Sequence, residues 1–446
     1  MAIRVGMVSL GCPKNQVDAE IILGLIEDGG FEIVNDAGVS DVVIINTCGF
    51  IESAKEESIE NILEFCTLKE EGRIKCVVIT GCLAERYKDE VAKEIPEADV
   101  ILGIGSNSQI VSAIKKAIAG QKVMEFAEKS KLPFNGKRIL ANLSFYAYVK
   151  IAEGCDNCCS YCAIPMIRGR YRSRASKDII DEVKSLVSDG VTEIILVAQD
   201  TTRYGEDLDS GESITSLLNE LCEIDGLHWI RILYSYPERI TDEFLDEMAN
   251  QPKIVKYLDM PIQHVNTDIL AAMNRQSDEE SIRILIDKIR SKMPDITLRS
   301  TLIAGFPGET QEQFEQLSEF VEEMRFDRMG CFAYSQEENT KAAKMPNQID
   351  EDTKKHRAEI INEQQTYIMI SRNEELVGKE VEVVVEGFDR YAECYFGRSA
   401  ADAPDIDPKI FFTSEVKPTI GEYIKVKIEQ AIDCDLIGVH INEYSE

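Results

Sequence analysis

Basic residues are few in this sequence relative to acidic ones. Its 446 residues contain 49 lysines and arginines against 80 aspartates and glutamates, for a formal net charge of −31 at pH 7. Binding to nucleic acid normally starts from a positive surface that neutralises phosphates. The charge therefore opposes non-specific nucleic-acid binding and suits a basic protein partner, while solubility alone would also account for it.

Long apolar runs are absent as well. The chain has no stretch of about 18 apolar residues, the length that a membrane-spanning helix needs. The first residues, MAIRVGMVSLGCP, lack a basic segment followed by a long apolar run. We therefore expect a cytoplasmic chain that is neither exported nor membrane-spanning. Its 44% hydrophobic content suffices for a sizeable core, and its length predicts two or three domains.

Strand-like and helical patterns alternate through the first two thirds of the chain. In the N-terminal part, strands are predicted at residues 3–10, 41–46 and 75–80, with helices beginning near Asn15, Glu52 and Glu85. In the central part, strands are predicted at residues 145–152, 193–199, 229–234, 256–260, 297–305 and 328–335. We expect an α/β chain with a parallel-sheet domain over 1–125, a linker over 126–140, and a partial TIM-type (β/α)6 barrel over 141–377.

Short runs of period-two alternation follow a long helical stretch near residues 350–376. They predict a small antiparallel β-barrel over residues 378–446. This segment has a net charge of −8 by count, and its acidic residues, such as Asp402 and Asp405, are candidates for contact with a substrate.

Three cysteines follow the first central strand within EGCDNCCSYCAIP. Cys155, Cys159 and Cys162 are spaced C-x3-C-x2-C, so three thiolates on one short loop can bind three irons of a cubane cluster and leave the fourth iron open. A zinc site is the alternative, since Cys155 and Cys158 form one pair and Cys159 and Cys162 another. Zinc-binding pairs are normally about a dozen residues or more apart, whereas these abut, so the spacing favours a cluster and leaves Cys158 without a role.

A second set of cysteines lies in the N-terminal part. Cys12, Cys48 and Cys82 each follow a predicted strand and stand beside a glycine. Because parallel strands end at one edge of a sheet, the three thiols can converge into a second site with one open iron. The alternative is three buried cysteines at tight turns. The remaining cysteines lack spaced partners and are interpreted as packing residues: Cys66, Cys76, Cys222, Cys331, Cys394 and Cys434.

Other polar and glycine residues are predicted at the same barrel mouth. In LIAGFPGE, Gly305, Gly308 and Glu309 follow a strand, where backbone amides can approach a ligand, although a plain strand-to-helix turn has the same pattern. Gln199 and Asp200 end the second central strand, and helix capping by Asp200 is an alternative.

The C-x3-C-x2-C motif after the first strand of such a barrel resembles the radical S-adenosylmethionine (SAM) superfamily. This resemblance implies that the open iron binds SAM and that electron transfer releases a 5′-deoxyadenosyl radical. It also implies that Tyr161 lies near the adenine and that the glycine-rich segment contacts SAM.

Two open clusters followed by a small barrel resemble the methylthiotransferases over the whole chain. The resemblance implies two 4Fe-4S clusters, of which the N-terminal one carries or donates sulfur. It further implies that one SAM supplies the methyl group while another is cleaved, with a flavodoxin- or ferredoxin-type electron donor and a separate sulfur source. If both cysteine sets were structural zinc sites instead, the chain would be a non-enzymatic interaction protein.

Several strings indicate one branch of that family. SLGCPKNQVDAE, INTCGFIESAKEESI, KIAEGCDNCCSYCAIPMIRGRYRSR, VAQDTTRYG, YLDMPIQH and GRSAADAPDID resemble the ribosomal-protein aspartate methylthiotransferases. This implies as substrate an aspartate of small-subunit ribosomal protein twelve, modified at its β-carbon to 3-methylthioaspartate. The alternative is a MiaB-type tRNA methylthiotransferase, whose members usually read GCQMN where this chain has GCPKN. Their C-terminal TRAM barrel, which the last segment resembles, tends to be basic.

Some residues remain outside these assignments. The run RGRYRSR, with Arg168, Arg170, Arg172 and Arg174, is able to bind phosphate, but lining the SAM and substrate mouth or pairing with local acids is favoured. A structural role is expected for His264. Cys158 beside a predicted ligand, and Asn339 where glycine is typical, depart from the family pattern.

Overall fold

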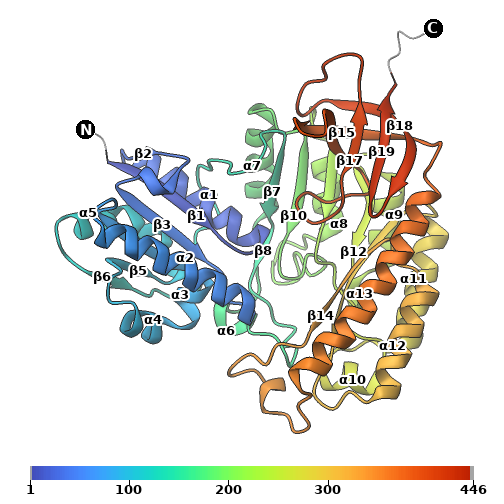
Figure 1. Ribbon diagram of the computed structural model, residues 1–446, viewed down its shortest axis with the longest axis horizontal. Helices are drawn as coiled ribbons and strands as arrows, with labels where there is room; N and C mark the ends of the chain where they lie inside the picture. The colour runs from blue at the N-terminus through green and yellow to red at the C-terminus, as the bar shows by residue number, and fades with distance from the viewer. Residues whose placement is uncertain (1–2, 442–446) are drawn as a thin grey trace.

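The N-terminal part forms a parallel six-stranded sheet. The computed structural model describes residues 3–441 (Figure 1). The strands are β1 (Arg4–Ser9), β2 (Glu32–Ile33), β3 (Val42–Thr47), β4 (Cys76–Gly81), β5 (Val100–Leu102) and β6 (Val123–Glu125), in the order β2-β1-β3-β4-β5-β6. The helices are α1 (Pro13–Asp28), α2 (Glu52–Glu70), α3 (Cys82–Arg86), α4 (Lys88–Glu94) and α5 (Ile110–Ile118). Strands β3 and β4 are buried throughout, as expected for a sheet covered on both faces.

Two features of this sheet differ from the prediction. Strands β2, β5 and β6 have two or three residues each, too few for an alternating pattern to be visible in the sequence. The helix expected near Glu85 is instead a pair of short helices, α3 and α4. Helix α3 begins at Cys82 because Gly81, with φ of 96°, turns the chain directly out of β4.

The segment between the two sheets is fastened to α1. The backbone amide of Ile139 donates to the Glu20 carbonyl at 3.2 Å, and Arg138 pairs with Glu20 in a buried position. A side chain at Gly24 would lie 2.0 Å from the Lys137 carbonyl oxygen, so the two backbones are in direct contact. Residues 126–140 therefore hold the first helix in place rather than acting as a free tether, and the domain boundaries on either side stay a prediction.

All six predicted central strands are present. They are β7 (Tyr146–Lys150), β10 (Glu193–Val197), β11 (Trp229–Ile232), β12 (Ile254–Asp259), β13 (Thr297–Ala304) and β14 (Arg328–Ala333), parallel and in the order β14-β13-β12-β11-β10-β7. The short strands β8 (Ala152–Glu153) and β9 (Arg172–Ser173) pair separately. The helices are α6 (Ile164–Arg168), α7 (Ser176–Ser188), α8 (Ile214–Cys222), α9 (Asp242–Asn250), α10 (Thr267–Ala272), α11 (Glu279–Lys292), α12 (Gln311–Met324) and α13 (Glu351–Glu374).

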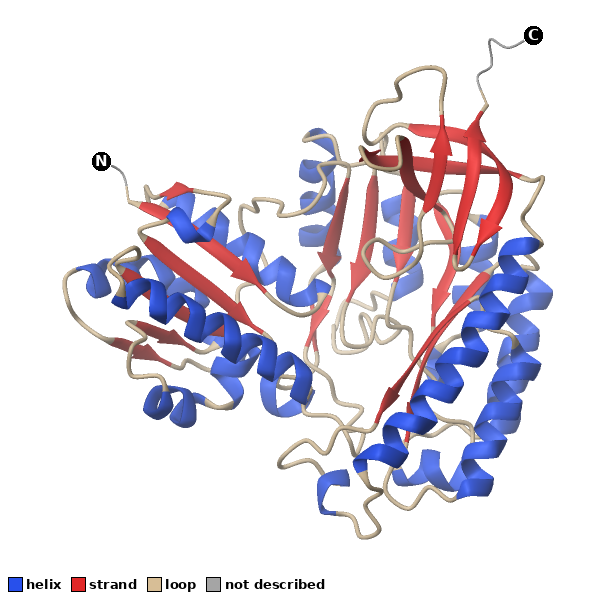
Figure 2. Cartoon of the chain, viewed as in Figure 1, coloured by secondary structure: helices blue, strands red, loops and turns tan. Residues whose placement is uncertain are grey.

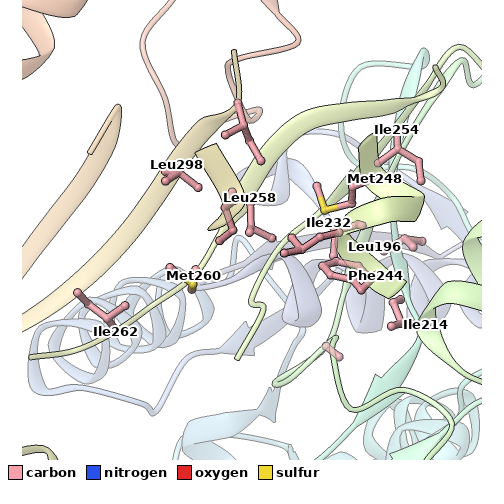
Figure 3. Close-up of a cluster of buried hydrophobic side chains, with 14 of the residues drawn as sticks. Leu196, Ile214, Ile232, Phe244, Met248, Ile254, Leu258, Met260, Ile262 and Leu298 are labelled. Atoms are coloured by element: carbon pink, nitrogen blue, oxygen red, sulfur yellow. The ribbon is translucent and has the colours of Figure 1, made fainter. Parts of the chain in front are cut away.

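The two faces of the central strands bury different surfaces. Leu196, Ile232 and Leu258 lie on the outer face and pack against helix residues such as Phe244 and Met248 of α9 (Figure 3). Their inward-facing neighbours on the same strands join a second cluster that includes Val17 and Ile21 of α1 and Val384 and Ala403 of the C-terminal barrel. The concave face of the sheet is thus covered by the other two parts of the chain.

The C-terminal strands form a closed barrel. They are β15 (Glu380–Asp389), β16 (Cys394–Ser399), β17 (Ile410–Thr413), β18 (Tyr423–Ile432) and β19 (Asp435–His440), in the order β15-β16-β17-β19-β18. The expected antiparallel pairing is wrong for one pair, because β17 and β19 run parallel. The chain crosses from β17 to β18 before turning back, so the β18–β19 hairpin inserts β19 next to β17.

This barrel seals the amino-terminal edge of the central sheet. Arg328, the first residue of β14, pairs with buried Asp402 at 2.7 Å, and the Tyr146 hydroxyl at the start of β7 donates to Asp405 at 3.1 Å. Both aspartates therefore link the two domains. Asp402 is buried and not available to a substrate, which corrects the expectation that it contacts one, whereas a substrate contact of the exposed Asp405 stays a prediction. No helix within residues 3–441 is both long enough and apolar enough to cross a membrane.

Candidate functional site

The carboxyl ends of the two parallel sheets point into the same region. Figure 1 and Figure 2 show the arrows of β1 and β3 ending near α6 and β8, the point to which the first central strand also leads. Ligands of open α/β sheets and of α/β barrels bind at this edge. Both predicted cysteine sets lie in this region, one at the end of the N-terminal sheet and the other on the loop that follows β8.

Cys12, Cys48 and Cys82 come together as the sequence predicted. Cys12 follows β1 and caps the start of α1, Cys48 follows β3, and Cys82 follows β4 as the first residue of α3. The strands β1, β3 and β4 are neighbours in the sheet. Cys48 and Cys82 are buried, and each of the three thiols is close enough to influence the ionisation of another.

The glycines beside these cysteines permit the close approach. A side chain on Gly11, whose φ is 95°, would lie 2.9 Å from the Cys48 sulfur. One on Gly49 would lie 2.7 Å from the backbone nitrogen of Leu83, next to Cys82. The glycines are therefore required sterically, since any other residue would force the three turns apart.

A pair of asparagines frames the first two turns. The Asn15 side-chain amide donates to the Leu10 carbonyl at 2.7 Å, and that of Asn46 donates to the Asn15 carbonyl at 2.8 Å. Both side chains are buried, so these hydrogen bonds fix the turn carrying Cys12 against the one carrying Cys48. Sequence reasoning missed both residues, because Asn46 lies within a strand and Asn15 within a helix, where no local pattern indicates a contact between two turns.

Cys155, Cys159 and Cys162 lie on one loop between β8 and α6. The Cys162 amide donates to the Cys159 carbonyl at 3.1 Å, which closes the loop into a turn. The side-chain amide of Asn274 donates to the carbonyl of Cys158 at 3.1 Å and holds the loop from outside. Cys158 itself is exposed and has φ of 54°, so its side chain is directed differently from those of its neighbours.

Burial affects the ionisation of the thiols in both sets. Burial raises the pKa of Cys82 and of Cys155 to about 12, and it raises that of Cys162 as well. Protonated thiols would be inert here, whereas bound iron would favour the thiolates. No group of three His, Cys, Asp or Glu side chains in residues 3–441 is arranged around a single ion. Cubane ligands bind separate irons and need not converge on one point.

Helix α6 connects the two cysteine sets. It follows the Cys155–Cys162 loop directly, and Ala163 and Ile167 pack against Cys82 of the other set. Arg168 at the end of α6 donates to the Cys82 sulfur at 3.2 Å. A helix of five residues therefore begins just after the loop of one set and contacts a cysteine of the other.

Buried ion pairs hold Arg168 in this position. Arg168 pairs with Asp18 of α1 at 2.5 Å and with Glu153 at 3.3 Å, and Lys150 pairs with the same two carboxylates. Burial alone would raise the pKa of Glu153, but Lys150 and Arg168 outweigh it and lower the pKa to about 2. Glu153 therefore stays ionised at neutral pH, and the four side chains join the N-terminal domain to the central sheet.

Replacing Arg168 with methionine should destabilise the protein strongly. It would leave two buried carboxylates facing one ammonium, and breaking such a pair costs about 3–5 kcal/mol. Arg170→Met is the matched control, because the Arg170 side chain is 89% exposed and its pair with Asp156 lies at the surface. Urea unfolding of the two iron-free variants should show a large decrease in the free energy of unfolding for Arg168→Met only. Equal midpoints would contradict this account of the network.

Tyr161 and the glycine-rich segment lie together, as predicted. Tyr161 packs against the cluster that contains Phe306 and Tyr334. Gly308, with φ of 85°, faces open space, whereas the Gly305 amide donates to the Glu309 carboxylate at 3.0 Å. Arg357 also pairs with this buried carboxylate, at 2.7 Å. Glu309 therefore orders the turn, and a contact of these residues with SAM stays a prediction.

Gln199 and Asp200 lie on the other side of the cysteine loop. The Gln199 amide donates to Glu153 at 2.8 Å, and Asn157 of the loop donates to Asp200 at 2.8 Å. Asp200 does not precede a helix, because the next helix, α8, begins at Ile214 and is capped by Ser213. The alternative of helix capping by Asp200 is therefore wrong. Both residues support the cysteine loop, and their contact with a cofactor stays a prediction.

Three of the four arginines in the run pair with local acids, and Arg172 instead donates to backbone carbonyl oxygens. Arg168 is occupied as described, and Arg174 is buried and pairs with Glu182 at 2.6 Å, so neither is available to bind phosphate. His264 is fully buried and lies 3.4 Å from Glu309, in agreement with a structural role. Asn339 has φ of 67°, a left-handed conformation that asparagine tolerates better than most residues, which explains its place at a glycine position.

A buried lysine beside Cys12 was not anticipated from the sequence. The Lys14 ammonium lies 3.2 Å from the centroid of the Tyr234 ring, at the end of β11. Tyr234 has φ of 63°, which is unusual for a bulky residue. The pairing joins the two domains, so no local pattern in either segment reveals it.

Three segments of the chain match known protein families. Residues 4–103 match the uncharacterized protein family UPF0004, and residues 149–321 match the radical SAM superfamily. Residues 377–441 match the TRAM domain.

Curated relatives align over nearly the whole chain. The ribosomal protein uS12 methylthiotransferase RimO of Desulforamulus reducens is 50% identical over 97% of this chain and 98% of its own. The protein of the same name from Caldicellulosiruptor saccharolyticus is 48% identical over 98% and 99% of the two chains. That of Geobacter sulfurreducens is 44% identical over 98% of each.

Solved structures share the fold at low identity. The radical S-adenosylmethionine methyltransferase TsrM from Kitasatospora setae aligns with a TM-score of 0.55 and 16% identity, covering 75% of this chain and 74% of that one. The cobalamin-dependent S-adenosylmethionine radical enzyme OxsB aligns with a TM-score of 0.52 and 11% identity, covering 81% and 56%.

Proposed function

Because this chain belongs to the RimO family of ribosomal protein uS12 methylthiotransferases, we propose that it attaches a methylthio group to an aspartate of uS12. The product is 3-methylthioaspartate, substituted at the β-carbon. The cofactors are SAM and two 4Fe-4S clusters.

The observation that carries this proposal is the joining of two three-cysteine sets by α6. One set ends three strands of the N-terminal sheet, and the other lies at the mouth of the central barrel. Sulfur insertion at an unactivated carbon needs a radical source and a sulfur source near the same substrate atom. The contacts of α6 with Cys82 supply that proximity.

We assign separate roles to the two sets. Cys155, Cys159 and Cys162 would hold the cluster that binds SAM, and Cys12, Cys48 and Cys82 the auxiliary cluster. When bound, the first supplies the electron that cleaves SAM to a radical, and the second carries or donates sulfur. The buried network of Arg168, Lys150 and their acids keeps the two sets in register.

The tRNA alternative has less support. Eight curated relatives of 43–50% identity carry the uS12 name. The C-terminal barrel, with its net charge of −8, would repel phosphates but attract a basic ribosomal protein. Of the arginines in RGRYRSR, Arg168 and Arg174 are buried in ion pairs.

Other parts of the proposal rest on the family alone. We place the protein in the cytoplasm, where ribosomes are assembled, with a flavodoxin- or ferredoxin-type electron donor and a separate sulfur source. The domain boundaries proposed are 1–125, 141–377 and 378–446, with the linker at 126–140.

A direct assay tests the substrate. Reconstituted protein is incubated anaerobically with SAM, sulfide and a reductant, and is offered either purified uS12 or tRNA. We expect mass spectrometry to detect a methylthio adduct on one aspartate of uS12 and none on tRNA. An adduct on tRNA alone would overturn the proposal.

A further inference from the structure

We propose that the Lys14 ammonium binds the side-chain carboxylate of the substrate aspartate and thereby selects an acidic residue for modification. This inference rests on the proposed function and adds a specificity-determining residue to it. Lys14 is the second residue of α1 and lies two positions after Cys12.

Lys14 is unusual among the buried lysines of the chain. The four lysines buried in the described residues are Lys14, Lys55, Lys150 and Lys354. The last three each pair with at least one carboxylate, for example Lys354 with Glu351 at 2.6 Å and Lys150 with Glu153 at 2.7 Å. Lys14 takes part in none of the ion pairs found within residues 3–441, although only 8% of it is exposed.

The Lys14 ammonium is buried without a carboxylate partner in the described residues. It lies in the first turn of α1, where the helix dipole repels positive charge. Burial of an ammonium without a carboxylate is also costly. Asp259 of the central sheet, whose charge acts on Lys14, already pairs with Arg299 at 2.8 Å and accepts a hydrogen bond from the Tyr234 amide at 2.9 Å. The Lys14 ammonium therefore has no carboxylate partner within the described chain and is able to pair with one from a substrate.

Tyr234 is held in a strained conformation that supports Lys14. Its left-handed backbone is fixed on one side by Asp259 and on the other by Thr201, whose amide and hydroxyl both donate to the Tyr234 carbonyl at 3.1 Å. Strain of this kind persists only where the surrounding structure enforces it, and it is concentrated at functional sites. Here it places the ring face 3.2 Å from the ammonium and orients it.

The position of Lys14 suits a carboxylate next to the reacting carbon. Its ammonium stands between Cys12 of the sulfur-bearing set and the carboxyl end of β11 in the barrel. An ammonium has three donors, and the Tyr234 face leaves donors free for carboxylate oxygens. In aspartate the carboxylate carbon is bonded directly to the β-carbon. A cation that holds the carboxylate therefore also fixes the carbon that receives sulfur.

The test compares two substrates on two proteins. Wild-type protein and Lys14→Met, which keeps the length and apolar stem of lysine, are reconstituted with iron and sulfide. Each is titrated with uS12 and with uS12 in which the modified aspartate is replaced by asparagine. We expect wild type to bind the aspartate form more tightly by on the order of tenfold or more, and Lys14→Met to bind both forms equally. Lys14→Gln, which keeps a neutral donor, should also lose the preference.

Iron content and 5′-deoxyadenosine formation are measured on the same samples. The inference predicts that both are retained in Lys14→Met, with a raised KM for uS12. The inference is overturned if Lys14→Met still prefers the aspartate form of uS12. It is also overturned if Lys14→Met and Lys14→Gln both lose a cluster, because Lys14 would then be needed for cluster binding. If wild type modifies uS12 but the preference survives in Lys14→Met, only this inference fails. If wild type modifies no uS12, the proposed function fails.

Discussion

Replacing Cys155, Cys159 and Cys162 together with alanine is expected to abolish the formation of 5′-deoxyadenosine from SAM. These thiols are the ones that the loop between β8 and α6 presents at the carboxyl edge of the barrel. Without them no cluster binds there, and electron transfer to SAM has no path. Chromatography of the reaction mixture quantifies the nucleoside, which should fall to the level of a protein-free control.

Cys158→Ala is the matched control for this variant. Cys158 lies on the same loop but is exposed, and alanine would carry the same left-handed backbone strain. It should form 5′-deoxyadenosine at the wild-type rate. Loss of the reaction in Cys158→Ala, or its survival in the triple variant, would show that the ligands are assigned incorrectly.

Replacing Cys12, Cys48 and Cys82 with alanine should separate the two halves of the reaction. SAM cleavage should continue, because the barrel loop and its supports from Asn157 and Asn274 are untouched. Methylthiolation of uS12 should become undetectable, because the sulfur-bearing set is gone. Both products can be followed in one anaerobic assay by mass spectrometry.

Cys434→Ala is the control for the second variant, since Cys434 is half-buried in the C-terminal barrel and distant in sequence from both sets. It should modify uS12 normally. Sulfur transfer that survives in the triple variant would refute the auxiliary role. Loss of SAM cleavage as well would mean that the N-terminal set also shapes the SAM site.

Much of the fold was predictable because its strands are nearly continuous apolar runs. EIILV in β10 and VVIINT in β3 are buried on both faces, so burial itself makes them visible in the sequence. The cysteine sets were predictable for a related reason. Each thiol follows such a run, and parallel strands bring their ends together. The very short strands β2 and β6 lack this signal.

Contacts between domains could not be predicted from local patterns. Arg168 is one of four arginines at every second position of RGRYRSR, and only its burial against Asp18 and Cys82 distinguishes it. The left-handed backbone of Tyr234 depends on two hydrogen bonds, one that its amide donates to Asp259 and one that its carbonyl accepts from Thr201. Both partners lie far away in sequence. Asp402 looked like a surface acid because its partner, Arg328, belongs to another domain.

Mössbauer spectroscopy of protein reconstituted with ⁵⁷Fe tests most directly the central claim that two separate cysteine sets each hold a cluster. Wild type should bind two 4Fe-4S clusters, and each triple-alanine variant should bind one, with the two remaining spectra adding up to that of wild type. A variant that keeps both clusters, or a wild-type protein that takes up zinc in place of iron at either set, would contradict the account.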